Sequence, residues 1–180
     1  MKINRENSLF CLVDVQEKLF PHVANCTRLE ENLIKLVQGL TILNVPFIVN
    51  EQYKKGIGAT IPAVAALITN QPHFEKTTFS SCGNSDTLAA IKQHNKTQVI
   101  VAGIEAHVCV MQTCLDLLEQ GLQPILVCDC ISSRKASDMD FAVQRLIQAG
   151  VIPTTYESLL FELTGDSKDP LFKNISALIK

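Results

Sequence analysis

The stretch VIVAGIEAHVCVMQTCLDLLEQG, residues 99–121, places a cysteine where an apolar strand-like run gives way to a helical pattern. Cys109 lies near the expected start of that helix, beside backbone N–H groups that a helix start leaves unpaired. This position favours a thiolate, and the same N–H groups can stabilise an oxyanion on an attacked carbonyl. The alternative is a core cysteine that faces the sheet, which is the more common fate of a cysteine. Spacing alone leaves both interpretations open.

Two charged residues could assist such a thiol. Asp14 directly follows the apolar run LFCLV, and a carboxylate at the end of a buried strand is unfavourable unless it is paired or functional. The alternative for Asp14 is a capping or loop-pinning role. Lys76, in HFEKTTFSS, is an ordinary solvated lysine unless its strand brings it to Asp14, where it could pair with that carboxylate. His107 is a tempting base, but side chains at i and i+2 of a helix do not face each other, so we expect a recognition or capping role.

The remaining cysteines are not expected to take part in the chemistry. The chain has seven cysteines and no secretion signal, so reduced thiols are the default, and without a C-x-x-C pair structural zinc is not expected. Cys11 and Cys114 are expected in the core, and Cys82, in a polar loop, is expected to be exposed. Cys128 and Cys130 bracket Asp129 at the end of a strand.

Strand and helix patterns alternate along the chain. Apolar, β-branched runs predict strands at 8–13, 46–50, 98–103, 124–128 and 151–156, with a shorter strand near 72–76. Helical periodicity and end signals predict helices at 28–44, 85–95, 107–121, 137–150 and 169–180, and a short one near 60–69. Such alternation predicts an α/β fold with a parallel sheet covered by helices on both faces. Ligands bind such sheets at the carboxyl ends of the strands, which is where Asp14, Glu51 and the 103–109 turn fall.

Length and composition narrow the classes of protein further. A chain of 180 residues suits a single domain, 1–180, and 47% hydrophobic with 19% charged residues excludes a disordered chain. A net charge of −2 without a basic block predicts no nucleic-acid partner. No apolar run reaches the length of a membrane span and no signal-peptide layout is present, so the sequence predicts a soluble, cytoplasmic protein.

Three segments in order, LFCLVDVQEKLF, FEKTTFSS and VIVAGIEAHVCV, together resemble the cysteine hydrolases of the isochorismatase-like/nicotinamidase superfamily. GIEAHVCV, NEQYKKGIGAT (50–60) and the tail LTGDSKDPLFKNISALIK most resemble the isochorismatase domain-containing branch. The resemblance implies a three-layer, Rossmann-like fold with a sheet of about six parallel strands. It also implies a catalytic triad of Asp14, Lys76 and Cys109.

In the implied mechanism, Asp14 takes the thiol proton, Cys109 attacks a carbonyl, and a covalent acyl-enzyme forms. Asp14 then serves as acid for the leaving group and base for water, while Lys76 orients the pair. The resemblance further implies a cis peptide bond between Ile104 and Glu105. That bond would direct the Glu105 N–H, together with the Cys109 N–H, at the oxyanion.

The substrate is only partly defined by these patterns. The candidate substrate contacts are Gln16, Gln52, Tyr53, Phe79 and His107. Nicotinamidases carry an Asp-x-His metal motif where this chain reads VNEQYKKG, so no metal or other cofactor is expected. Isochorismatases proper act on a vinyl ether without needing a cysteine, so Cys109 favours acyl transfer. The prediction is a metal-independent cysteine hydrolase, most simply an amidase, acting on a small carbonyl substrate as a homo-oligomer. The alternative is a catalytically quiet protein of this fold that acts through protein partners.

Overall fold

A six-stranded, wholly parallel sheet forms the centre of the protein. The computed structural model describes all residues, 1–180. The strands are β1 (Ser8–Val13), β2 (Phe47–Gln52), β3 (His73–Lys76), β4 (Gln98–Ile104), β5 (Gln123–Ser132) and β6 (Ile152–Thr154). Their order across the sheet is β3-β2-β1-β4-β5-β6. From the adjacent central strands β1 and β4, the strands β2 and β3 extend the sheet towards one edge and β5 and β6 extend it towards the other. The predicted α/β fold with a parallel sheet covered on both faces is confirmed.

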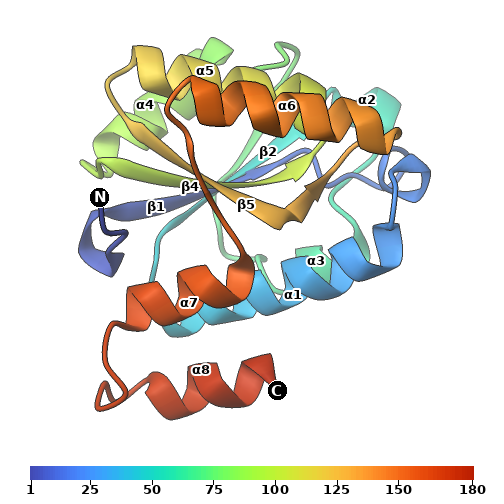
Figure 1. The fold of residues 1–180 in the computed structure, drawn as a ribbon. Helices are drawn as coiled ribbons and strands as arrows, with labels where there is room; N and C mark the ends of the chain where they lie inside the picture. The colour runs from blue at the N-terminus through green and yellow to red at the C-terminus, as the bar shows by residue number, and fades with distance from the viewer.

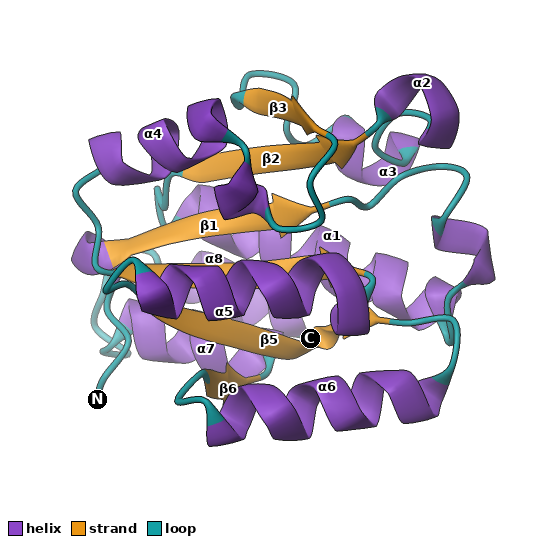
Figure 2. Ribbon diagram, turned by 90° about the horizontal axis from the view of Figure 1, so that it is seen from above, coloured by secondary structure: helices purple, strands orange, loops and turns teal.

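Helices form the two outer layers (Figures 1 and 2). One face of the sheet carries α1 (Cys26–Ile42), α3 (Pro62–Ala65), α7 (Tyr156–Thr164) and α8 (Phe172–Ile179). The other face carries α4 (Ser85–Gln93), α5 (Met111–Glu119) and α6 (Ala136–Gln148), and α2 (Lys54–Ile57) follows β2. Successive residues of a strand point to opposite faces. Phe10 and Leu12 accordingly belong to the core under α1, and Leu9 and Cys11 to the core under α5. None of the helices combines the length and the hydrophobicity that a membrane span requires.

The C-terminal third differs from the sequence prediction in two places. The predicted strand 151–156 is only Ile152–Thr154, because Thr155 accepts the Ser158 N–H and starts α7, a helix that the prediction missed. The predicted helix 169–180 begins later, at Phe172. Asp169 accepts the Leu171 N–H in a turn and pairs with Arg5, so it does not cap the helix as expected.

The sheet is unusually tight where β1 and β4 end. Gly103 has φ +129°, and a Cβ at this residue would lie 2.0 Å from the carbonyl oxygen of Val13. The pairing of β4 with β5 shifts register between Val101 and Gly103 of β4. β5 itself extends beyond the predicted 124–128. Only glycine allows this close approach of the two backbones. Because Asp14 directly follows Val13, the contact also helps to set the position of Asp14.

Candidate active site

Two strand ends bring Asp14 and Lys76 together. Asp14 follows β1 and Lys76 is the last residue of β3, so both lie at the carboxyl edge of the sheet with β2 between them. Lys76 Nζ donates to Asp14 Oδ2 at 2.7 Å, and neither side chain is exposed at all. The topology therefore converts a lysine that would ordinarily be solvated into a buried partner of the carboxylate.

The remaining hydrogen bonds of Lys76 come from its surroundings. Its ammonium donates to Gln52 Oε1 at 2.8 Å, to the Phe79 carbonyl at 3.0 Å and to the Thr78 carbonyl at 3.3 Å. An ammonium has three protons, so these contacts together with Asp14 satisfy it fully. Lys76 is thus held in one position beside Asp14.

Asp14 keeps one oxygen free. Its backbone is left-handed at φ 52°, an uncommon conformation for a residue with a side chain. Asp14 Oδ1 is buried and has no hydrogen-bond partner within the usual distance and angle limits. Burial raises the pKa of Asp14, while the charge and hydrogen bond of Lys76 and a contact from the Cys109 thiol act to lower it. A buried carboxylate oxygen without a donor is rare, and it is suited to accept a proton from a neighbouring group.

Cys109 is that neighbouring group. It lies in a π-helical turn, Ala106–Val110, that leads directly into α5, and it is 7% exposed. Burial raises the pKa of the Cys109 thiol and the Asp14 charge raises it further, whereas Lys76 lowers it. These surroundings oppose the thiolate that the helix start is expected to favour. A thiol with a raised pKa needs a base in order to react.

The turn before Cys109 is held by its own contacts. The peptide bond between Ile104 and Glu105 is cis. The Glu105 N–H donates to no backbone or side-chain acceptor. The Glu105 carboxylate is buried and accepts both the backbone N–H and Nε–H of Arg134, each at 3.0 Å. A free N–H therefore lies four residues before the thiol, on a residue whose side chain is anchored.

Two of the predicted substrate contacts hold the protein itself together. Gln16 is fully buried, and its amide accepts the Gln52 N–H at 2.7 Å and donates to the carbonyls of Gln52 and Gly58. Gln52 joins Lys76 to the Thr77 carbonyl. The structure thus places Gln16 and Gln52 as supports of the strand ends, with their amide groups already engaged.

The other three predicted contacts lie nearer to solvent. Tyr53 and Phe79 follow Gln52 and Lys76 closely in the chain, and they are 51% and 54% exposed. His107 Nδ1 lies 2.9 Å from Ser133 Oγ, and its Nε2 lies 3.9 Å from Asp138, so the ring faces the loop after β5. Tyr53 and Phe79 are therefore available for contacts outside the chain.

Sequence reasoning missed part of this site. Arg134 and Ser133 were not singled out, because the strand predicted at 124–128 ends well before them, whereas β5 extends to Ser132. Glu51 was noted only as a polar residue at a strand end. In the structure it accepts the backbone N–H and hydroxyl of Thr60 and pairs with Lys54. Glu51 thus fixes the segment that connects β2 to α3.

Three of the other cysteines, Cys11, Cys82 and Cys114, lie in the same core as Cys109. Cys11 and Cys114 are fully buried in the core, as predicted. Cys82 is only 9% exposed, because the Ser81–Gly83 turn folds into the same core, so the expectation of an exposed thiol is wrong. Cys26 and Cys128 are half-buried.

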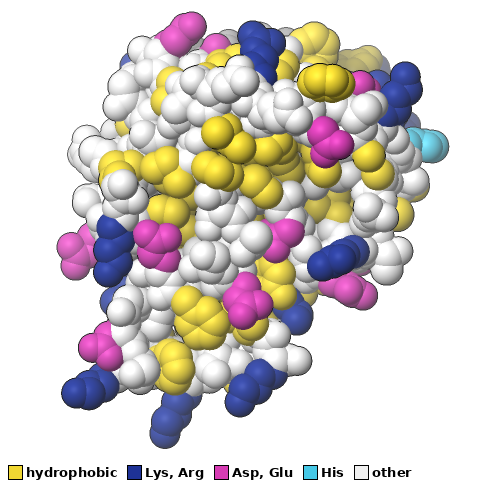
Figure 3. Space-filling view, viewed as in Figure 1, with side chains coloured by type: hydrophobic (Ala, Val, Ile, Leu, Met, Phe, Trp, Pro, Cys, Tyr) yellow, Lys and Arg dark blue, Asp and Glu magenta, His cyan; other side chains and the backbone are white.

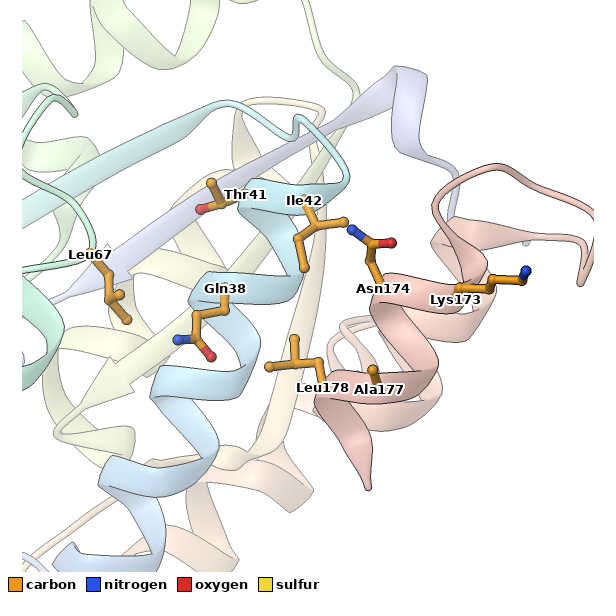
Figure 4. Close-up of a pocket in the computed structure, with 8 residues that line it drawn as sticks. All are labelled: Gln38, Thr41, Ile42, Leu67, Lys173, Asn174, Ala177 and Leu178. Atoms are coloured by element: carbon orange, nitrogen blue, oxygen red, sulfur yellow. The ribbon is translucent and has the colours of Figure 1, made fainter.

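The largest cavity of the protein lies elsewhere. It is an open groove of about 720 Å³ between α1 and α8 (Figure 4), and none of its lining residues belongs to the candidate site. Its lining is Gln38, Thr41, Ile42, Leu67, Lys173, Asn174, Ala177 and Leu178. No group of three His, Cys, Asp or Glu side chains in the structure is arranged to hold a metal ion. Lys173 is the only charged residue of this lining, which contains no carboxylate, imidazole or thiol.

The fold and the strand-end site define a class of α/β proteins with a candidate cysteine centre, and the comparison with known proteins identifies the family. The isochorismatase domain matches residues 8–158, and the chain belongs to this family. Isochorismatase domain-containing protein 2 of Danio rerio is 39% identical over 178 residues, covering 99% of this chain and 89% of that protein. The family prediction, including the domain-containing branch, is confirmed.

Solved structures agree with this assignment. The structure titled MAR1 ribonuclease from Caenorhabditis elegans is 40% identical, with a TM-score of 0.94 over 99% of this chain and 92% of that one. The YcaC protein of Escherichia coli, described as an octameric hydrolase of unknown specificity, has a TM-score of 0.95 over 99% of this chain and 89% of that one. At 23% identity, YcaC supports the fold alone.

Proposed function

We propose that the protein is a metal-independent cysteine hydrolase that cleaves an amide or related C–N bond of a small carbonyl compound. One observation carries the proposal: the unpartnered Asp14 Oδ1 lies buried beside a neutral thiol, and Lys76 holds the other carboxylate oxygen. Base, nucleophile and orienting cation are the three parts that nucleophilic catalysis requires. Membership of a family that includes hydrolases supports the same class of reaction.

The first half-reaction forms a thioester. Asp14 Oδ1 takes the proton from Cys109 Sγ, and the sulfur attacks the substrate carbonyl carbon to give a tetrahedral oxyanion. The unengaged Glu105 N–H is a candidate donor to that oxyanion. The intermediate collapses as the C–N bond breaks, and the proton on Asp14 passes to the departing nitrogen. The acyl group is then bound to Cys109 and Asp14 is again a carboxylate.

The second half-reaction regenerates the enzyme. Asp14 takes a proton from water, and the resulting oxygen nucleophile attacks the thioester carbonyl. The C–S bond breaks, the acid product leaves, and the proton on Asp14 returns to Cys109. A pKa of Asp14 raised by burial suits a group that must both accept and release a proton near neutral pH.

The proposal extends to the molecule as a whole. Residues 1–180 act as one catalytic domain, because the two hydrophobic cores pack against opposite faces of the same sheet. The protein works as a homo-oligomer, as the octameric YcaC does. The exposed Tyr53 and Phe79 are the side chains proposed to contact substrate beside the buried triad.

A second candidate function comes from the name of one neighbour. The Caenorhabditis elegans protein is titled a ribonuclease, and it is 40% identical to this chain. The charge distribution argues against RNA as the substrate here. The net charge is −2, and on the face shown in Figure 3 the Lys and Arg side chains are interspersed with Asp and Glu. The cations nearest the site, Lys76 and Arg134, are already paired with carboxylates.

The test is a hydrolysis screen of small amides, ureides and esters, with a single-stranded RNA as an additional substrate. Wild type, Cys109→Ala and the matched control Cys26→Ala are assayed in parallel. We expect hydrolysis of at least one amide or ester by wild type and the control, and loss of that activity in Cys109→Ala. Activity that survives in Cys109→Ala contradicts the mechanism. Cys109-dependent cleavage of RNA alone would favour the ribonuclease, and no turnover would favour the catalytically quiet alternative.

A further inference from the structure

The turn that carries the nucleophile is fastened to a single loop. Glu105 accepts two hydrogen bonds from Arg134, from the backbone N–H and from Nε–H. Two residues later, the His107 ring lies 2.9 Å from Ser133 Oγ, and the His107 N–H donates to the same hydroxyl at 3.4 Å. Ser133 and Arg134 are adjacent and directly follow β5. The turn and this loop are therefore joined by four contacts.

The carboxylate of Glu105 is the central group in this arrangement. Its side chain is 9% exposed, whereas that of Arg134 is 63% exposed. A buried carboxylate is stable only when charged or polar donors satisfy it, and both donors come from one residue of the loop. Since the Glu105 N–H has no acceptor, the same residue combines an anchored side chain with a free backbone donor.

We infer that Glu105 is a positioning residue: its carboxylate, held by Arg134, fixes its own N–H where the oxyanion forms on an acyl group attached to Cys109. This inference rests on the proposed acyl-transfer function. An oxyanion donor is effective only when it is already oriented, and displacement by about 1 Å lowers rates by about 10²-fold. The loop Ser133–Arg134 thereby supports catalysis without touching the reacting atoms.

The experiment separates the oxyanion from the thiol with two reagents. Iodoacetamide alkylates Cys109 without forming an oxyanion, whereas p-nitrophenyl acetate acylates Cys109 through a tetrahedral oxyanion. Both rates are measured on the intact protein, alkylation by mass spectrometry of the Cys109 peptide and acylation by release of p-nitrophenol. The ratio of the two rates reports on the oxyanion donors and is insensitive to a general loss of folded protein.

For Glu105→Ala we expect acylation to fall by about 10²-fold, while alkylation is preserved. The pH midpoint of alkylation also moves to lower pH. Burial and the Asp14 charge contribute most to the raised pKa of Cys109, Lys76 opposes them, and the Glu105 charge adds a further increase that the variant removes. Arg134→Ala keeps the backbone N–H of residue 134 and loses only Nε–H, so its acylation falls by about 10-fold.

A matched control is the pair formed by Arg5 and Asp169, a half-exposed arginine and a carboxylate 3.1 Å apart and distant from the site. Arg5→Ala leaves both rates unchanged. Parallel loss of alkylation and acylation in Glu105→Ala and Arg134→Ala would overturn the inference, because Glu105 would then support the thiol or the fold. Unchanged acylation in both variants would overturn it as well. Acylation that persists in Cys109→Ala would instead contradict the proposed function.

Discussion

At the scale of single residues, the site depends on two charges that would each be unfavourable alone. The side chains of Asp14 and Lys76 are completely buried and 2.7 Å apart. Removing one partner of a buried pair leaves the other charge without compensation, whereas removing both is frequently tolerated. Single and double variants of the pair therefore separate its effect on stability from its effect on catalysis.

Asp14→Asn should lower the rate of Cys109 acylation by about 10²–10⁴-fold, because the neutral thiol loses its base. The same variant leaves Lys76 buried without a counter-charge and should lose about 3–5 kcal/mol of unfolding free energy. Urea denaturation and p-nitrophenol release measure the two effects. The double variant Asp14→Asn/Lys76→Met should regain stability but not activity. Recovery of acylation in the double variant would show that Asp14 is not the base.

The thiol itself illustrates how burial can outweigh a helix terminus. The position of Cys109 near a helix start favours a thiolate on electrostatic grounds. The site instead buries the thiol beside a carboxylate, and both effects raise the pKa of Cys109. Under the proposed mechanism, reactivity comes from proton transfer to Asp14, which makes the carboxylate as important as the sulfur.

At the scale of elements, the ends of β1 and β4 set the position of Asp14. Gly103→Ala would place a Cβ 2.0 Å from the Val13 carbonyl oxygen at a φ of +129°. We expect a loss of about 3 kcal/mol or more of unfolding free energy and a parallel loss of acylation. Gly121→Ala is the control: its φ is +76° but no atom lies within 4 Å, so the backbone conformation alone costs about 1 kcal/mol. Equal effects of the two variants would contradict the close-approach argument.

The connection after β2 is held by Glu51. Burial by itself would raise the pKa of Glu51, but hydrogen bonds from Lys54 and Thr60 hold it below its usual value. A lowered pKa in the folded state stabilises the fold above the unfolded-state pKa of about 4.3, and this contribution disappears as pH falls through the folded value.

Glu51→Gln should therefore lose about 1–3 kcal/mol of unfolding free energy at pH 7, as expected for hydrogen bonds to a charged group. The difference from wild type should shrink as the pH is lowered below about 4, where wild-type Glu51 also becomes neutral. Denaturant midpoints measured between neutral and acid pH check this. A difference that does not vary with pH would assign the effect of Glu51 to packing.

At the scale of the whole molecule, several large apolar side chains face solvent in the single chain. Phe141 on α6 is 72% exposed, and Phe79 and Tyr53 beside the site are about half exposed. Aromatic residues are enriched where a protein surface meets another molecule. They are consistent with the proposed homo-oligomer.

We expect light scattering to give a mass that is a multiple of 19.8 kDa. Phe141→Ser should shift the mass towards that of the single chain if α6 lies at a subunit interface. Phe161 on α7 lies on the other side of the sheet and is 38% exposed, so Phe161→Ser is the matched variant. A wild-type mass of 19.8 kDa at micromolar concentration would contradict the oligomer.

The sequence alone predicts the alternation of strands and helices, since apolar runs and helical periodicity are local patterns. It also predicts which residues stand at strand ends, including Asp14 and the turn before Cys109. α7 was missed although Leu159, Leu160 and Leu163 have helical spacing, because the preceding apolar residues were interpreted as a longer strand. Local patterns cannot show where one element yields to the next when both are apolar.

What these residues contact depends on how the elements pack together in the fold. Asp14 and Lys76 are 62 positions apart, and their pairing depends on the strand order that sets β3 beside β2. The engagement of Gln16 and Gln52, the burial of Cys82 and the direction of the Cys109 pKa shift all depend on neighbours from other elements. Burial and hydrogen bonding are properties of the assembled sheet, so a residue's identity and spacing predict its candidacy for a role but not its protonation or its partners.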